Sequence, residues 1–198
     1  MDILWLGIQP NYPSPDDYSG RYKALWDETG LYLLFDITDD VIYDGVRQPL
    51  DKYWRDDTVE LFIDENNSGG SHTGQNFANA WAYHISIYNE NVDEIRNANQ
   101  VIDGHVITQR ISEGDKHIWE MKVNIYGDNY NPDASNTPIT LNVGKTMGFS
   151  AAYIDNDNSF PASQNDRESM MGSVDTQGHK DNRGFLNADV FGDLILVE

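Results

Sequence analysis

The sequence of 198 residues contains no cysteine. This absence excludes disulfide bonds, zinc sites with thiolate ligands and catalytic thiols, and it leaves the redox compartment undetermined. Basic residues are scarce, with 13 lysines and arginines against 33 acidic residues and a formal net charge of −20. A chain this acidic repels nucleic-acid phosphates and anionic membranes, so we expect neither as a partner. It favours neutral ligands and cations instead.

Long apolar runs are also missing. No stretch approaches the roughly 20 residues that a membrane-spanning helix needs, so we expect no membrane insertion. The N-terminus has neither a basic start nor a cleavage site, and any export signal would lie upstream of this sequence. Helical periodicity over more than about ten residues, internal repeats and coiled-coil heptads are absent as well.

The sequence does contain many short alternating segments. Residues 58–64 alternate between apolar and polar side chains, which predicts a strand with one buried face and one solvated face. Residues 31–37 are apolar at nearly every position, as in a central strand that is covered on both faces. Turn residues between alternating segments predict hairpins over residues 21–38 and 101–125. Further strands are expected at residues 3–8, 81–88, 146–155 and 190–197.

About nine or ten strands with turn signals between them predict an all-β fold, an antiparallel β-sandwich. The length suits a single domain over residues 1–198, with residues 1–18 as a peripheral strand and a proline-rich connector. A tryptophan, Trp54, stands just before the strand that carries Glu60. A flat ring beside hydrogen-bonding groups on a rigid strand suits a sugar, which packs a C–H face on the indole while its hydroxyls find partners.

Three fragments of the sequence, at residues 25–40, 54–67 and 191–196, form a recognisable set. The first begins Leu-Trp-Asp-Glu-Thr-Gly, and the last reads Phe-Gly-Asp-Leu-Ile-Leu. The central fragment, Trp-Arg-Asp-Asp-Thr-Val-Glu-Leu-Phe-Ile-Asp-Glu-Asn-Asn, is the most specific. In order and spacing, over most of the chain, these fragments resemble the family 9 carbohydrate-binding modules, which are attached to bacterial xylanases and related polysaccharide-degrading proteins.

The resemblance implies a sandwich that grips sugar units between two aromatic rings. By position, these rings are Trp54 and Phe185, and the second is a tryptophan in better-studied members. His84 and Ser86 stand where those members have an arginine and an asparagine, which bears on the sugar that is bound. The residues that the resemblance implies for orienting the sugar are Glu60, His84, Ser86 and Asn182.

The function implied is that of a non-catalytic carbohydrate-binding module that needs no cofactor. It would bind poly- or oligosaccharide such as xylan and target an attached glycoside hydrolase or surface protein to it. The expected location is extracellular, periplasmic or on the cell surface. Family members often bind structural calcium, and clustered oxygens in turns suit that ion. The calcium candidates, none with EF-hand spacing, are Asp39, Asp40, Asp64, Glu65, Asp155 and Asp157.

Other interpretations stay open. The rings and polar residues could be structural, and the domain a mere spacer. A haem-binding electron-transfer domain of the same fold could use methionine and histidine ligands, such as Met170 or Met171. A glycoside hydrolase could pair Asp57 with Glu60. However, residues three apart on one strand point to opposite faces, which disfavours this pairing.

Overall fold

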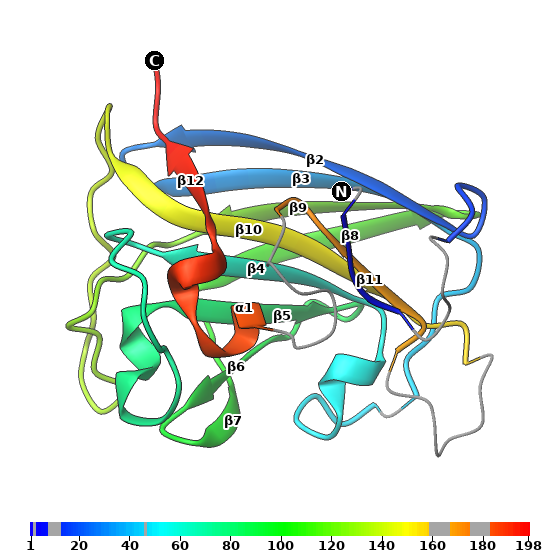
Figure 1. Cartoon of the computed structure of the whole chain (residues 1–198), viewed down its shortest axis with the longest axis horizontal. Helices are drawn as coiled ribbons and strands as arrows, with labels where there is room; N and C mark the ends of the chain where they lie inside the picture. Colours follow the sequence, from blue (N-terminus) through cyan, green and yellow to red (C-terminus); the bar gives the residue numbers. More distant parts are fainter. Residues whose placement is uncertain (2, 8–12, 46, 159–166, 175–182) are drawn as a thin grey trace.

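The chain forms a β-sandwich of two antiparallel sheets, as the sequence predicts (Figure 1). Apart from strands, the described residues form one α-helix of four residues and three short 3₁₀ helices. The fold is therefore all-β. No helix in the described part of the chain is long and apolar enough to cross a membrane. The computed structural model describes residues 1, 3–7, 13–45, 47–158, 167–174 and 183–198.

The larger sheet has eight strands, in the order β1-β11-β10-β4-β5-β6-β7, with β12 paired to β10 beside this path. The sequence analysis does not predict β6, β7 and β11, because these short segments show no alternation of apolar and polar side chains. The strands are β1 (Ile3–Gly7), β4 (Thr58–Asp64), β5 (Trp81–Ser86), β6 (Asn91–Ile95), β7 (Ala98–Val101), β10 (Thr146–Asp155), β11 (Ser169–Gly172) and β12 (Gly192–Ile195).

The smaller sheet has the order β2-β3-β9-β8 and contains both predicted hairpins. Its strands are β2 (Tyr18–Asp27), β3 (Gly30–Asp39), β8 (Val106–Glu113) and β9 (Lys116–Val123). The core between the two sheets is built from alternate residues of both, such as Phe35 and Trp119 of the smaller sheet and Leu61, Ile85 and Tyr153 of the larger one. Burial of these side chains is the main force that holds the sheets together.

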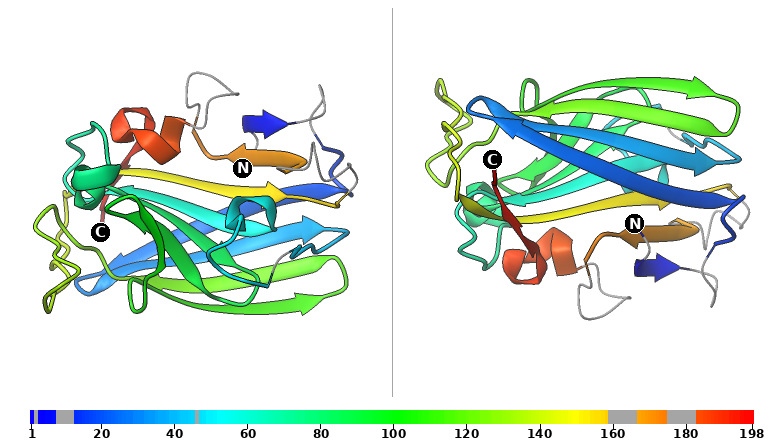
Figure 2. Two further views of the ribbon diagram at one scale, coloured as in Figure 1. Left: turned by 90° about the horizontal axis from the view of Figure 1, so that it is seen from below. Right: turned by 90° about the horizontal axis from the view of Figure 1, so that it is seen from above.

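Short helical elements lie outside the strands: η1 (Tyr53–Arg55), η2 (Gly74–Asn79), α1 (Arg183–Leu186) and η3 (Ala188–Val190). Figure 2 shows α1 on one side of the sandwich and the hairpin of β8 and β9 on the opposite side. A second, smaller apolar cluster forms on the outer face of the larger sheet, where Phe185 of α1 packs against a buried group that includes Phe62 of β4 and Ala82 of β5.

Two expectations about exposure are wrong. All seven residues of β4 are buried, including the face that carries Thr58, Glu60 and Asp64, because β4 lies inside the larger sheet and this face is covered. The outer face of β3 is not covered, and alternate residues from Tyr32 to Thr38 are only half-buried. No described element packs over that side of the smaller sheet.

Candidate functional site

A cavity of about 370 Å³ opens on the outer side of the larger sheet. Its described walls come from η1, β5, β6, β7, α1 and the segment that precedes β11. Trp54 and Phe185, which are 131 positions apart in the sequence, both line it. The described lining residues are Tyr53, Trp54, His84, Glu94, Asn99, Arg167 and Phe185.

The rings of the cavity meet one another edge to face. Tyr53 is the central ring: its centroid lies 5.3 Å from that of Trp54, at an interplanar angle of 81°, and 4.6 Å from that of His84, at 79°. The ring of Phe185 follows at 6.5 Å from His84 and 76°. Edge-to-face contacts of this kind stabilise aromatic clusters beyond simple burial. They fix the ring planes before any ligand arrives.

His84 is held from behind by a buried carboxylate. Its Nε2 lies 2.6 Å from Oε1 of Glu60, which is 1% exposed. Its Nδ1 lies 3.3 Å from the carbonyl oxygen of Ala82. Both ring nitrogens therefore face acceptors within the protein, and the ring turns its carbon edge and faces to Tyr53 and Phe185. Glu60 itself lies beneath His84 and is not among the residues that line the cavity.

Trp54 is positioned by the carboxylate of Asp57, three residues later. Asp57 is fully buried and accepts hydrogen bonds from the backbone N–H groups of Tyr43, at 2.5 Å, and Asn156, at 2.8 Å. It therefore ties the segment before η1 and the residue that follows β10 to the start of β4. Burial and the nearby Asp39 raise the pKa of Asp57, and the two N–H donors oppose this rise. Its role in the Trp-Arg-Asp-Asp motif is structural.

Phe185 is positioned by contacts of α1 with the loop that follows β4. His72, which is buried, places Nε2 2.8 Å from the carbonyl oxygen of Gly184, and its backbone N–H donates to the carbonyl of Leu186 at 3.3 Å. Gly184 lies close to the ring of Phe62, where an added Cβ would come within 3.4 Å. A four-residue helix cannot hold itself in place, so these contacts fix the ring.

The sequence analysis missed Glu94 and Asn99. These residues face each other across the β6–β7 hairpin, so both side chains reach the cavity from one cross-strand pair. The hydroxyl of Tyr53 donates to Oδ1 of Asn99 at 3.3 Å. The sequence signal that could have located them is Asn97, because asparagine tolerates the positive φ that a two-residue hairpin turn requires. Arg96 and Asn97 do adopt positive φ, and such a turn sets the register of the hairpin. The analysis also missed Arg167.

The remaining predicted residues lie away from the cavity or cannot be placed. Ser86 donates through its hydroxyl to Oε2 of Glu90 at 2.7 Å and accepts from two backbone N–H groups. It lines a narrow hollow on the other side of His84. Asn182 lies outside the described residues. Of the two methionines considered as haem ligands, Met170 is fully buried in the outer apolar cluster, and neither Met170 nor Met171 lines the cavity.

A second polar site is an acidic cluster where β3 and β10 end. The carboxylates of Asp39, Asp155 and Asp157 place oxygen atoms within 4.8 Å of one another, and Asp17 and Asp40 form a neighbouring group with Asp157. Four of the six calcium candidates therefore lie in these two groups, and three of them, Asp39, Asp155 and Asp157, meet in one. Asp64 instead accepts N–H groups of its own loop, and Glu65 pairs with Lys145.

The acidic cluster has more carboxylate oxygens than described hydrogen-bond donors to them. Asp39 accepts from the hydroxyl of Tyr153 at 2.6 Å, and Asp155 uses Oδ2 to accept from Ser169 at 2.8 Å. No described residue donates to Oδ1 of Asp155, although this side chain is 1% exposed. Burial and then the neighbouring acids raise the pKa of Asp155 to about 8 and that of Asp157 to about 7. Oxygen atoms gathered in this way suit a hard cation.

Residues 4–198 match the family model described as carbohydrate family 9 binding domain-like. No curated protein sequence matches the chain. A family 9 carbohydrate-binding module from Caldicellulosiruptor kristjanssonii, solved in complex with cellotriose, superposes with a TM-score of 0.67 at 19% identity, over 91% of this chain and 75% of that chain. A family 9 module from the same organism in complex with glucose superposes with a TM-score of 0.65 at 19% identity, over 94% of this chain and 83% of that chain. A putative carbohydrate-binding protein from Bacteroides uniformis ATCC 8492 superposes with a TM-score of 0.58 at 11% identity, over 98% of this chain and 84% of that chain. Because the family model covers nearly the whole sequence, the chain belongs to the carbohydrate family 9 binding domain-like proteins.

Proposed function

We propose that the protein is a non-catalytic module that binds a short stretch of polysaccharide in the cavity between Trp54 and Phe185. One observation carries the proposal: two aromatic residues from distant parts of the chain line one cavity together with polar side chains. A pyranose ring has apolar C–H faces and a rim of hydroxyls, so it needs this combination of ring surface and hydrogen-bonding groups.

The polar residues of the cavity would orient the sugar. Glu94 accepts hydrogen bonds, Asn99 can accept and donate, and Arg167 donates, so together they match hydroxyl groups, which do both. His84, which is almost fully buried, supports the rings of Tyr53 and Phe185, and Glu60 acts through it as a positioning residue. Glucose and cellotriose, which the two Caldicellulosiruptor structures contain, are therefore suitable first probes.

Two features support a binding role without catalysis. Glycosidases use a pair of carboxyl groups across the sugar bond. Among the described residues that line the cavity, Glu94 is the only carboxylate. Asp57, which a hydrolase would need beside Glu60, is fully buried and accepts backbone N–H groups on both sides. Binding is expected to be modest, in the micromolar to millimolar range, because few groups contact a short sugar.

The family resemblance supports a wider role for the module. We propose that it is linked to a glycoside hydrolase or a surface protein outside the cytoplasm and keeps that partner on its polysaccharide, with xylan among the substrates to test. Holding an enzyme on an insoluble polymer raises its effective concentration there without any new catalytic contact. No cofactor is required for this role.

We also propose that Asp39, Asp155 and Asp157 hold a structural calcium ion. The support is the convergence of their oxygens and the buried Oδ1 of Asp155, to which no described residue donates. The cluster joins the end of β3 in the smaller sheet to the end of β10 in the larger one. A cation here would offset the repulsion among the acids and tie the two sheets together.

Calorimetric titration of the purified chain with glucose and cellotriose tests the sugar-binding proposal. Trp54→Ala should weaken cellotriose binding at least about tenfold, because a stacked ring contributes a large part of the contact area. Trp26→Ala is the matched control, since it removes a half-buried indole of the smaller sheet, whose N–H donates to the carbonyl of Val197 at 2.8 Å. Unchanged affinity in a folded Trp54→Ala protein would overturn the proposal.

A further inference from the structure

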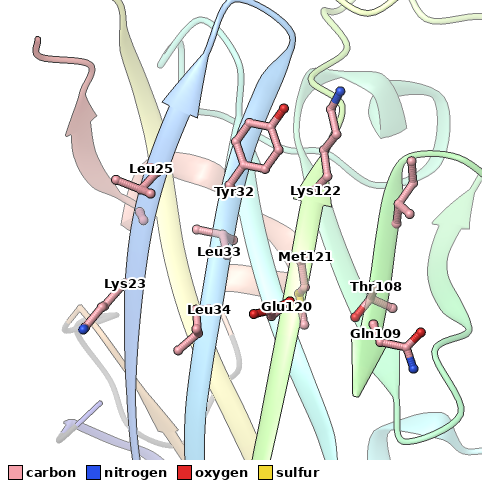
Figure 3. A pocket seen from close by; sticks show the side chains of 12 residues that line it. Lys23, Leu25, Tyr32, Leu33, Leu34, Thr108, Gln109, Glu120, Met121 and Lys122 are labelled. Carbon is pink, nitrogen blue, oxygen red and sulfur yellow. The ribbon is translucent and has the colours of Figure 1, made fainter. Parts of the chain in front are cut away.

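A broad trough lies on the other side of the sandwich, over the outer face of the smaller sheet (Figure 3). Its volume is about 920 Å³, more than twice that of the cavity beside Trp54. It crosses all four strands β2, β3, β9 and β8. The described lining residues are Lys23, Ala24, Leu25, Tyr32, Leu33, Leu34, Ile107, Thr108, Gln109, Glu120, Met121 and Lys122.

The strand register arranges the trough in two parallel rows. The first row crosses the sheet as Leu25, Tyr32, Lys122 and Ile107, which are cross-strand partners in that order. It is mostly apolar, and Leu25 and Ile107 are 74% and 57% exposed. Tyr32 is held in place because its hydroxyl donates to Asp27 at 2.9 Å.

The second row is mostly polar. It runs as Lys23, Leu34, Glu120 and Gln109, again one residue from each strand. Figure 3 shows these side chains beside the first row. No described residue forms a side-chain hydrogen bond with Lys23, Glu120 or Gln109. The row therefore offers an ammonium group, a carboxylate and an amide to a ligand.

We propose that this trough binds an internal stretch of a neutral polysaccharide and is a second glycan-binding surface. The rows lie about 7 Å apart, and the outer strands about 14 Å apart, so the trough can hold more than one sugar ring. A chain laid across the strands would place C–H faces on the first row and hydroxyls against the second. All of its described lining residues belong to the four strands of the sheet and none to a connecting loop, which suits a continuous polymer.

Charge and shape select this ligand over others. The trough carries Lys23, Lys122 and Glu120, in a chain of net charge −20. A polyanion would be repelled by the rest of the molecule, and a polycation would meet two lysines. A second copy of the chain would bring another molecule of net charge −20 against this one, and the repulsion disfavours that occupant. A neutral, narrow polymer meets neither obstacle.

Native gels that contain hydroxyethylcellulose, arabinoxylan or galactomannan can test the proposal with the full chain. Ile107→Glu places a carboxylate in the apolar row and should reduce retardation by at least one polymer about threefold or more. Val143→Glu is the matched control, because Val143 is also 57% exposed and lies outside the trough, so it corrects for the added charge. Trp54→Ala should keep part of its retardation, and the double variant should lose it.

Glucose titration of the same variants separates the two sites. Ile107→Glu should leave glucose binding unchanged, because one sugar unit is bound in the cavity. The trough proposal, which takes from the proposed function only the class of ligand, is overturned if Ile107→Glu and Val143→Glu migrate alike in all three polymers. It is also overturned if Ile107→Glu changes only the mass found by sedimentation, which would make the face a contact between copies.

A milder variant guards against misfolding. Gln109→Ala removes an exposed amide that has no described hydrogen-bond partner, so the fold should tolerate it. It should reduce retardation in the polymer that Ile107→Glu identifies, by about twofold or more. Retardation equal to that of the unmodified chain would contradict the proposal. Glucose binding by Trp54→Ala tests the cavity alone, whereas polymer retardation of Gln109→Ala tests the trough. Failure of one proposal can therefore be distinguished from failure of the other.

Discussion

Glu60 on β4 and His84 on β5 are opposite one another in the larger sheet, and Oε1 of the first lies 2.6 Å from Nε2 of the second. Both side chains are almost fully buried. The pair lies directly behind the rings that line the cavity, and the imidazole touches two of these rings edge to face. The carboxylate therefore sets the orientation of a ring that a ligand can meet, while it does not itself line the cavity.

Removing the Glu60 carboxylate should destabilise the protein. Glu60→Ala removes the acceptor beside Nε2 of the buried His84, and leaving a buried polar group without its partner typically costs about 1 to 3 kcal/mol in the free energy of unfolding. Glu60→Gln keeps the shape and an acceptor and should cost less. Urea unfolding followed by tryptophan fluorescence measures both, with Glu113→Ala on the exposed end of β8 as the control. A loss below about 1 kcal/mol for Glu60→Ala would show that the pair contributes little.

His72→Ala should weaken cellotriose binding although His72 does not line the cavity. The change removes the contact between its Nε2 and the carbonyl of Gly184, so α1 and Phe185 lose their fixed position. We expect a loss of affinity of about fivefold and partial rescue by His72→Gln, which can still donate. His117→Ala is the control, because that imidazole also approaches a backbone carbonyl, at 3.2 Å, but on the other sheet. Equal affinity for both alanine variants would contradict this role.

Phe185→Trp should strengthen cellotriose binding. The larger ring extends the stacking surface, and an improved aromatic contact contributes about 0.5 to 1.5 kcal/mol, or about a two- to tenfold rise in affinity. Phe185→Ala should lower it. Calorimetric titration measures both changes, and the melting temperature shows whether packing on Phe62 survives. Weaker binding by a folded Phe185→Trp variant would mean that the space beside Phe185 is already limiting.

The acidic cluster predicts a pH dependence of stability with a definite sign. The folded-state pKa values of Asp155 and Asp157 are raised from 3.8 to about 8 and about 7. The folded state therefore binds these protons more tightly than the unfolded state. Their favourable contribution is complete below about pH 4 and is lost as the pH rises through about 7 to 8. In a chelator, the melting temperature should fall between about pH 5 and pH 8.5.

Calcium should reverse that fall. It binds the deprotonated carboxylates, so the stabilisation it gives should be greatest at about pH 8 and small at about pH 5. Asp155→Asn should reduce both the pH dependence and the calcium effect, whereas Asp51→Asn, at an exposed position, should change neither. Thermal unfolding followed by circular dichroism, with and without calcium, gives these values. A melting temperature insensitive to calcium at pH 8 would contradict the metal site.

The fold was largely predictable because its signals are local. The hairpin of β2 and β3 follows from the Asp-Glu-Thr-Gly turn between two strand-forming segments, and that of β8 and β9 follows from Glu-Gly-Asp in the same way. The short strands β6 and β7 were missed, since their sequences show no alternation of apolar and polar side chains. Glu94 and Asn99 were missed with them.

The site was predictable only in part. The family motif pointed to Trp54, His84 and Phe185, which line one cavity. It gave Glu60 and Ser86 direct roles with the ligand, yet Glu60 lies beneath His84, and Ser86 is engaged with Glu90 on another side. Alternation along a strand tells which residues share a face. It does not tell what covers that face.

The sequence by itself determined the strands, the hairpins, the acidic charge and the residues available to meet a sugar, because each depends on neighbours along the chain. Tertiary structure alone decided which outer faces are covered. It buried the polar face of β4 beneath α1 and its surroundings and left the outer face of β3 open, since packing between distant segments removes water from a surface and local patterns do not record those segments.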